Sequence, residues 1–149
     1  MLNVFILEDD PIQLHQMKNN IEKIGANLDI KVDCKVFTNT DDLRKNLPQP
    51  SQSNVFILDL EINGIKNAGL EFSKKIRAHD QLASLIFITI HDEFLYRTYK
   101  YRVSALDFIA KDYSDIYAEL YKDIQQIETQ VQANNDEKPF VYTRLFQHD

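Results

Sequence analysis

The sequence lacks several features that would place it in a special class of protein. It contains a single cysteine, Cys34, so no disulfide can form within the chain. No apolar run approaches the length that crosses a bilayer, and the first residues carry no signal-peptide pattern. These absences predict a cytoplasmic protein that is neither exported nor embedded in a membrane.

Positive charge is also in short supply. The chain has 17 Lys and Arg against 23 Asp and Glu, which gives a formal net charge of −6. Binding to nucleic acid draws much of its free energy from basic side chains that neutralise phosphates and release counterions. We therefore expect that this chain alone does not bind DNA.

The composition and length are those of one ordinary globular domain. Hydrophobic residues make up 44% of the 149 residues and charged residues 27%, which is enough apolar material for a single core. Five short apolar runs are rich in β-branched or aromatic residues, as strands covered on both faces are. These runs are Val4–Leu7, Ile30–Phe37, Val55–Leu58, Leu85–Ile88 and Ala105–Ile109. The second run alternates more than the others, which favours an edge strand.

Helical patterns separate the five runs. Asp10 followed by Pro11 is a helix-start signal, and apolar residues then recur at helical spacing up to Gly25, which we expect to end the helix. Further helices are predicted after Thr38 or Thr40, near residues 70–76, from residue 94, and over residues 116–131. Five alternations of strand and helix predict an α/β fold with a doubly wound parallel sheet.

The last part of the chain has a different pattern. Residues 1–131 are predicted to form one domain, and residues 132–138 are polar and indicate a linker. Residues 140–146 resemble a strand that is too short to fold alone. We interpret residues 132–149 as a linker and the start of a missing output domain, or alternatively as a tail packed on the first domain.

Polar residues with chemical potential collect where the predicted strands end. Such ends meet at one edge of a parallel sheet, where ligands bind. The residues are Glu8, Asp9 and Asp10 after the first strand, Asp59 after the third, Thr89 on the fourth and Lys111 after the fifth. Crowded carboxylates keep a raised proton affinity unless a cation joins them. Mg²⁺ suits such a site because it is content with one or two carboxylates, waters and phosphate oxygens.

This set of residues points to phosphoryl chemistry. Asp59 is placed to attack phosphorus, as carboxylates do in aspartyl-phosphate chemistry. Mg²⁺ and Lys111 would neutralise charge on the transferred group, and Thr89 would offer a hydroxyl to it. Each residue alone has a plainer interpretation, such as a helix cap for Asp10 or a surface lysine for Lys111. The combination at the ends of ordered strands carries the prediction.

The same motifs resemble those of response-regulator receiver domains from two-component signalling. The resemblance rests on Leu7–Pro11, Phe56–Leu60, Phe87–Thr89 and Ala105–Lys111. It implies the flavodoxin-like receiver fold, a five-stranded (βα)5 arrangement with strand order 2-1-3-4-5. It also implies that the domain takes a phosphoryl group on itself and is not a turnover enzyme.

The resemblance further implies a metal site for Mg²⁺, with Mn²⁺ as an alternative ion. Glu8 and Asp9 correspond to the acidic pair, and Asp59 would be both a metal ligand and the phosphoryl acceptor. Glu61 would offer its backbone carbonyl to the metal.

The family pattern assigns contact and switch roles to three further residues. Thr89 and Lys111 would contact the phosphoryl group. Phe108 would be an aromatic switch residue whose rotamer follows Thr89. Ile90 departs from the small residue common at its position, and we expect its bulk to hinder water at the phosphoryl group.

Other departures resemble a quorum-sensing subfamily in which the receiver precedes a LytTR DNA-binding domain. The loop Glu61–Gly69 replaces the usual Met-Pro turn, and Asp112 stands where proline usually follows the lysine. This likeness implies a membrane histidine kinase that senses a secreted peptide, and control of competence or bacteriocin genes. DNA would be bound through a missing carboxyl-terminal LytTR-type domain.

A homodimer is expected through the face formed by the fourth helix, fifth strand and fifth helix. Four tyrosines supply aromatic side chains near that face, although partial burial against neighbouring helices is their plainer interpretation. They are Tyr96, Tyr99, Tyr101 and Tyr117.

Three rival functions are compatible with parts of the pattern. A receiver-like interaction module that works without phosphate would not need the set of Asp9, Asp59, Thr89 and Lys111. An aspartyl-phosphate phosphohydrolase would carry its nucleophile on the first strand and a second Asp two residues later. A flavodoxin-like flavin binder would need a phosphate-binding loop after the first strand, which this sequence does not have.

Overall fold

A parallel sheet lies at the centre of the molecule, in agreement with the predicted fold class. The computed structural model describes residues 1–90, 103–112 and 115–147, with the backbone alone described over residues 136–147. The five strands follow the order β2-β1-β3-β4-β5, as predicted, and every neighbouring pair is parallel. The strands are β1 (Leu2–Leu7), β2 (Val32–Phe37), β3 (Asn54–Leu58), β4 (Ser84–Thr89) and β5 (Asp107–Ala110).

The burial of each strand follows from its place in the sheet. All five residues of the central strand β3 are buried, because helices cover both of its faces. The edge strand β2 instead alternates between exposed and half-buried residues, which confirms the interpretation of its sequence pattern. The sheet therefore has a buried centre, apolar except for Asn54 at the start of β3, and one more exposed edge at β2.

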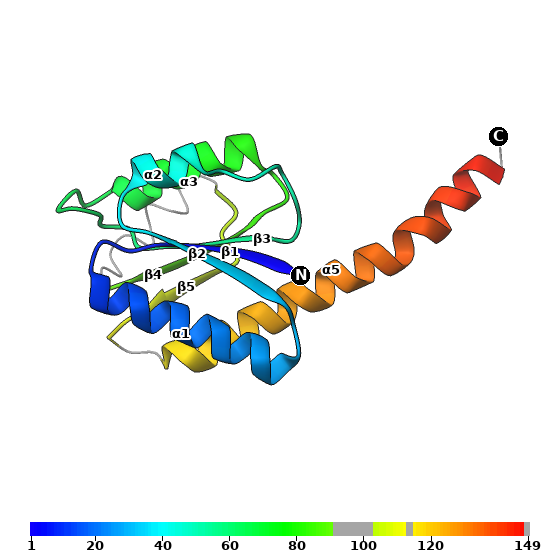
Figure 1. The fold of residues 1–149 in the computed structure, drawn as a ribbon. Helices are drawn as coiled ribbons and strands as arrows, with labels where there is room; N and C mark the ends of the chain where they lie inside the picture. The colour runs from blue at the N-terminus through cyan, green and yellow to red at the C-terminus, as the bar shows by residue number, and fades with distance from the viewer. Residues whose placement is uncertain (91–102, 113–114, 148–149) are drawn as a thin grey trace.

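In the described part of the chain, helices cover both faces of the sheet (Figure 1). Helices α1 (Pro11–Leu28) and α5 (Ile116–Gln147) share one face, and α2 (Thr40–Lys45) and α3 (Ala68–His79) share the other. Each face has its own core, with Ile21 and Leu120 in one and Leu43 and Leu70 in the other. The fourth helix predicted from residue 94 lies outside the described residues.

Helix α1 begins as predicted but ends later. The Asp10 side chain caps it by accepting a hydrogen bond of 2.9 Å from the Ile12 amide. The prediction that Gly25 ends the helix is wrong, because α1 continues to Leu28 and Asp29 caps it with φ 55°. Gly25 has a packing role instead: a Cβ at this position would lie 2.9 Å from Cγ2 of Val32, so its absence lets α1 approach β2.

The predicted strand at residues 140–146 is also wrong. Helix α5 continues without a break to Gln147 and extends well beyond the sheet (Figure 1). Residues 132–138 include Gln, Ala, Glu and Lys, which propagate a helix at little cost. An isolated segment has no neighbouring strand to pair with, so its strand-like composition does not decide its conformation. The division at residue 131 stays a prediction.

No helix in the described part of the chain has both the length and the apolar composition that a membrane-spanning helix needs.

Candidate functional site

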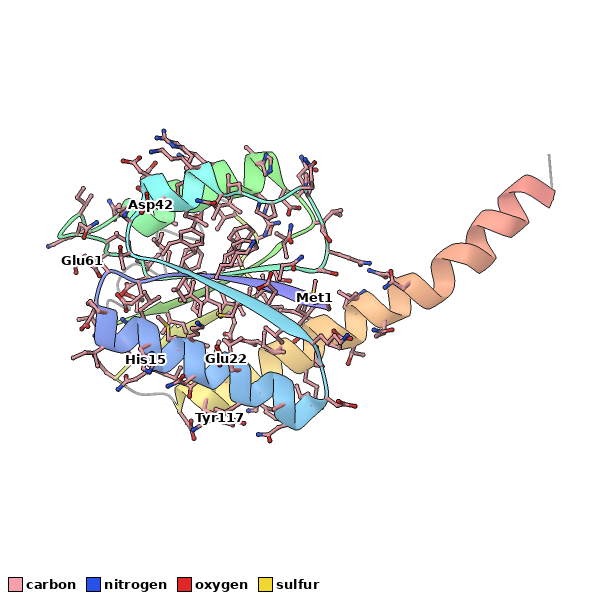
Figure 2. All side chains as sticks on the ribbon, viewed as in Figure 1. Met1, His15, Glu22, Asp42, Glu61 and Tyr117 are labelled. Carbon is pink, nitrogen blue, oxygen red and sulfur yellow. The ribbon has the colours of Figure 1, made fainter. Side chains whose placement is uncertain are left out.

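A polar pocket lies at the edge of the sheet where the strands end. Its volume is about 150 Å³. The pocket is lined by Glu8, Asp9, Asp10, Gln13, Asp59, Glu61, Gly64, Ile90 and Lys111. In Figure 2, Glu61 marks this edge, at the opposite end of the strands from Met1. The structure therefore brings together residues that are up to 103 positions apart in the sequence.

Lys111 is the cation of this pocket. Its Nζ lies 2.6 Å from Oε1 of Glu8 and 2.9 Å from Oδ2 of Asp59, and only 13% of its side chain is exposed. Burial alone would lower the pKa of Lys111, but hydrogen bonds to Glu8 and Asp59 outweigh it and raise that pKa. The lysine therefore stays charged and holds two carboxylates from different strands together.

Glu8 is the most deeply buried carboxylate of the pocket, with 1% of its surface exposed. The pKa of Glu8 is raised to about 7: burial contributes most, the hydrogen bond from Lys111 opposes the rise, and the charge of Asp59 adds to it. The raised proton affinity of Glu8 therefore comes from burial first and from crowding by Asp59 second, and Lys111 offsets it only in part.

The backbone around Asp59 is fixed on both sides. Its amide donates to the Leu7 carbonyl at 3.0 Å, and its Oδ1 accepts from the Glu61 amide at 3.2 Å. The first turn of α3 then packs directly against it: a Cβ on Gly69 would lie 1.7 Å from the Asp59 carbonyl oxygen. Gly69 is thus required for the position of Asp59, and no sequence pattern identified it.

The loop after β3 folds into a small hairpin over the pocket. Ile62 and Ile65 exchange backbone hydrogen bonds of 3.2 and 3.0 Å. Between them, Asn63 has φ 53° and Gly64 has φ 78°. The amide of Asn63 donates to Oδ2 of Asp9 at 2.7 Å, so the hairpin is attached to the acidic pair.

Gln13 is a second residue that the sequence analysis missed. Its Nε2 donates to Oδ2 of Asp10 at 3.1 Å, and its Oε1 accepts a short hydrogen bond from Nζ of Lys111. It lies in the first turn of α1, so the Asp10 cap places it beside the lysine. The only signal in the sequence was its position three residues after the cap.

Thr89 and Phe108 lie near the pocket without lining it. Thr89 ends β4 and is 2% exposed, and its carbonyl accepts from the Lys111 amide at 3.0 Å. Phe108 is half-buried and stacks on Phe87 with 5.4 Å between ring centroids. Their contact and switch roles stay predictions. Ile90 is 53% exposed at the pocket, where the sequence analysis expected it to limit access.

Only one of the four tyrosines proposed for a dimer contact can be assessed. Tyr117 is half-buried, and its hydroxyl accepts from Nδ2 of Asn27 on α1 at 2.6 Å. Its plainer interpretation, partial burial against a neighbouring helix, is therefore confirmed. Tyr96, Tyr99 and Tyr101 lie outside the described residues.

The donor set of the pocket fits Mg²⁺. In the ranges that the structure describes, no three His, Cys, Asp or Glu side chains form a ready-made metal cage. Mg²⁺ does not need one, because it keeps several waters and takes one or two carboxylates. Asp9 and Asp59 supply carboxylates at the pocket wall, and Glu61 lies beside them with its backbone carbonyl.

The geometry agrees with a family assignment. The model of the response regulator receiver domain matches residues 4–125 of this chain. The chain therefore belongs to the receiver-domain family of response regulators, which form one of the two components of two-component signalling systems.

Curated relatives include the accessory gene regulator proteins of staphylococci. The chain is 33% identical over 117 residues to accessory gene regulator protein A of Staphylococcus aureus strain N315, and 32% identical over 114 residues to that of Staphylococcus epidermidis. Each match covers 74% of this chain and 47% of the relative. The chain thus spans about half the length of the curated relatives it matches.

Solved structures show the same fold at lower identity. One is TrrA of Thermotoga maritima in complex with Mg²⁺-BeF, with a TM-score of 0.68, 21% identity, and coverage of 85% of this chain and 99% of that one. Another is the regulatory domain of mrkE from Klebsiella pneumoniae, with a TM-score of 0.71, 19% identity, and coverage of 89% and 99%.

Proposed function

We propose that this domain accepts a phosphoryl group on Asp59 from a histidine kinase and uses it to control an output. The observation that carries the proposal is the bridge from Lys111 to both Glu8 and Asp59 at the mouth of the sheet. The carboxylate of Asp59, the ammonium of Lys111 and further carboxylate oxygens line one pocket, which supports roles for them as nucleophile, cation and metal ligands. The neighbour TrrA, solved with Mg²⁺-BeF, supports a metal in this kind of pocket.

In the proposed reaction an oxygen of the Asp59 carboxylate attacks phosphorus. The new O–P bond replaces the P–N bond of the phosphohistidine, and the released imidazole takes a proton from solvent. Bound at Asp9, Asp59 and the Glu61 carbonyl, with Glu8 beside them, Mg²⁺ or Mn²⁺ would offset charge on the phosphoryl oxygens. The domain is consumed as an acceptor in this step and does not act as a turnover enzyme.

Lys111 has the central role among the residues of this chain. Its ammonium already lies 2.9 Å from Oδ2 of Asp59, so it can follow the negative charge from the carboxylate onto the bound phosphoryl group. Thr89, at the end of the neighbouring strand, would then offer its hydroxyl. Phe108 would change its packing on Phe87 in response, and this shift in populations would change the face around β5.

The output is proposed to be transcription, through a part of the protein not contained in this chain. The curated relatives are named as accessory gene regulators and are about twice as long as the matched region. This supports the expected LytTR-type DNA-binding domain after residue 131, a membrane histidine kinase as partner, and control of quorum-sensing genes. A homodimer through α5, β5 and the segment before β5 would complete the signal.

Intact-mass measurement tests the function directly. The chain is incubated with acetyl phosphate and Mg²⁺, beside Asp59→Asn and a sample without metal. We expect one added phosphoryl group only in the wild-type sample with Mg²⁺. If neither acetyl phosphate nor a cognate kinase phosphorylates folded protein, the phosphate-independent interaction module becomes the better description.

A further inference from the structure

The hairpin after β3 is hydrogen-bonded to the loop after β1, and both loops border the pocket. It lies between β3 and α3, a connection that extends past the edge of the sheet in Figure 1. Its Asn63 amide donates to Oδ2 of Asp9 at 2.7 Å, across 54 positions of sequence. Gly64 lines the pocket itself. The hairpin therefore contacts the acidic pair at the place where a cation would enter.

The conformation of the hairpin is set by its own residues. Positive φ at both central positions, 53° at Asn63 and 78° at Gly64, identifies a type I′ turn, for which Asn-Gly is the preferred pair. Ile62 is 2% exposed and anchors the first strand of the hairpin in the core, whereas Ile65 is 65% exposed. The Asn63 amide is thus pointed at Asp9 by a turn that does not depend on any ligand.

We propose that this Asn63–Gly64 turn is a positioning element for the metal ligand Asp9. The inference rests on the proposed function. An N–H group that donates to a carboxylate forms a charge-assisted bond, which holds the carboxylate in one orientation. A carboxylate has about four acceptor sites, so one bond to Asn63 leaves capacity for a cation. The turn holds Asp9 in place before the metal arrives, and this lowers the entropy lost on binding.

A substitution at Gly64 separates backbone geometry from steric contact. A Cβ at this position would meet nothing within 4 Å, so the first atom of a side chain fits and the strain comes from φ. Valine at φ 78° is strained, whereas asparagine tolerates this region. Gly64→Val therefore weakens the turn, and Gly64→Asn is the matched control that keeps it.

The test measures the affinity of the full chain for Mn²⁺ by electron paramagnetic resonance. We expect Gly64→Val to raise the Kd for Mn²⁺ by about five- to tenfold, the loss of one charge-assisted hydrogen bond, and Gly64→Asn to stay within about twofold of wild type. In an Asp9→Asn background the effect of Gly64→Val should vanish, which a general loss of structure would not produce. Equal affinities in the two Gly64 variants, or a loss that persists without Asp9, would overturn the inference.

Two further measurements keep this inference apart from the proposed function. Phosphorylation of Gly64→Val by acetyl phosphate should be reduced at low Mn²⁺ and should recover as Mn²⁺ is raised to saturation, because the turn acts through metal affinity and not through Asp59 or Lys111. A wild-type chain that is phosphorylated while both Gly64 variants bind Mn²⁺ normally refutes the inference alone, and a chain that binds no Mn²⁺ refutes both. If Gly64→Val does not fold, hydrogen exchange at the wild-type Asn63 amide decides: slow exchange in metal-free buffer is expected, and fast exchange without metal contradicts the inference.

Discussion

The two ends of β5 both carry crowded acidic side chains, yet the crowding is relieved in different ways. Lys111 follows the carboxyl end of the strand and bridges Glu8 and Asp59. At the opposite end, Asp107 opens the strand and interacts with Asp123 on α5. The comparison shows how the proton affinity of buried carboxylates depends on whether a lysine is hydrogen-bonded to them.

At the Asp107–Asp123 pair, protonation of Asp123 is what reduces the repulsion between the two carboxylates. The pKa of Asp123 is raised to about 8, mostly by burial, and the hydrogen bond and charge of Asp107 contribute to the rise. Within the described residues, Oδ2 of Asp123 is buried without a hydrogen-bond partner. A carboxylate in these surroundings takes up a proton more readily, whereas at the other end of the strand the ammonium of Lys111 is hydrogen-bonded to both Glu8 and Asp59.

The largest effect is expected from Gly69→Ala, which tests whether the close contact between Gly69 and the backbone of Asp59 positions the acceptor at the carboxyl end of the sheet. The new Cβ would lie 1.7 Å from the Asp59 carbonyl oxygen, so either α3 or Asp59 must move. We expect a loss of about 3 kcal/mol in the free energy of unfolding, as overpacking against rigid backbone costs. Urea unfolding measures the loss, and phosphorylation by acetyl phosphate should fall with it.

Gly25→Ala is the matched control for that experiment. Its Cβ would meet Cγ2 of Val32 at 2.9 Å and the carbonyl oxygen of Ile30 at 3.1 Å, so a shift of a few tenths of an ångström is enough, in contrast to the 1.7 Å contact at Gly69. A smaller loss is therefore expected, with phosphorylation unchanged. If the two variants lose the same stability and Gly69→Ala is phosphorylated normally, the close contact with Asp59 does not position the acceptor.

Removing the ammonium of Lys111 should leave the carboxylates at both ends of β5 without a hydrogen-bonded lysine. Lys111→Met leaves Glu8 and Asp59 buried together without their shared partner, and we expect a loss of about 2 kcal/mol in unfolding free energy at pH 8. Lys122→Met is the control, because the side chain of Lys122 is 73% exposed and its ion pair with Glu119 is a long 4.0 Å. Equal urea midpoints for the two variants would show that Lys111 does not compensate the carboxylates.

The smallest effect on the free energy of unfolding is expected from Asp123→Asn, beside the first residue of β5, and it depends on pH. Because the pKa of Asp123 rises from 3.8 to about 8 on folding, the folded chain binds the proton more tightly. The stability from this group is complete below about pH 4 and is lost as the pH rises through about 8. Asp123→Asn keeps a neutral side chain at every pH, so it should exceed wild type by about 1 kcal/mol at pH 8 and match it near pH 4.

Urea unfolding at pH 4 and pH 8 checks this prediction. Asp33→Asn on the exposed edge strand β2 is the control, and its difference from wild type should not change between the two pH values. A wild-type protein whose stability rises between pH 4 and pH 8 relative to Asp123→Asn would reverse the sign and contradict the raised proton affinity of Asp123.

The sequence allowed the fold and the central site residues to be predicted because both depend on local patterns. Continuous apolar runs marked the buried strands, and the residues that end them, such as Asp59 and Lys111, could be placed at one edge from the alternation of elements alone. The motifs around these residues then pointed to the receiver family, which the family model bears out over residues 4–125.

The two errors have different causes. Gly25 is a common helix stop, but here the approach of β2 gives it a place inside α1, so a contact between distant segments outweighed the local signal. Residues 140–146 have a strand-like composition, but the helix that precedes them continues through them. A strand needs a partner strand, so composition alone did not decide the conformation of this segment.

The sequence by itself determined the order of strands and helices, the polar residues at the strand ends and the family, because each is written in periodicity or in a contiguous motif. Only the tertiary structure decided that Gln13 contacts Lys111, that the Asn63 amide holds Asp9, and that Gly69 packs on Asp59. These are contacts between segments far apart in the chain, set by how α1, α3 and the hairpin settle on the sheet. No local pattern encodes a distance between two such segments, because that distance is fixed by packing of the whole domain.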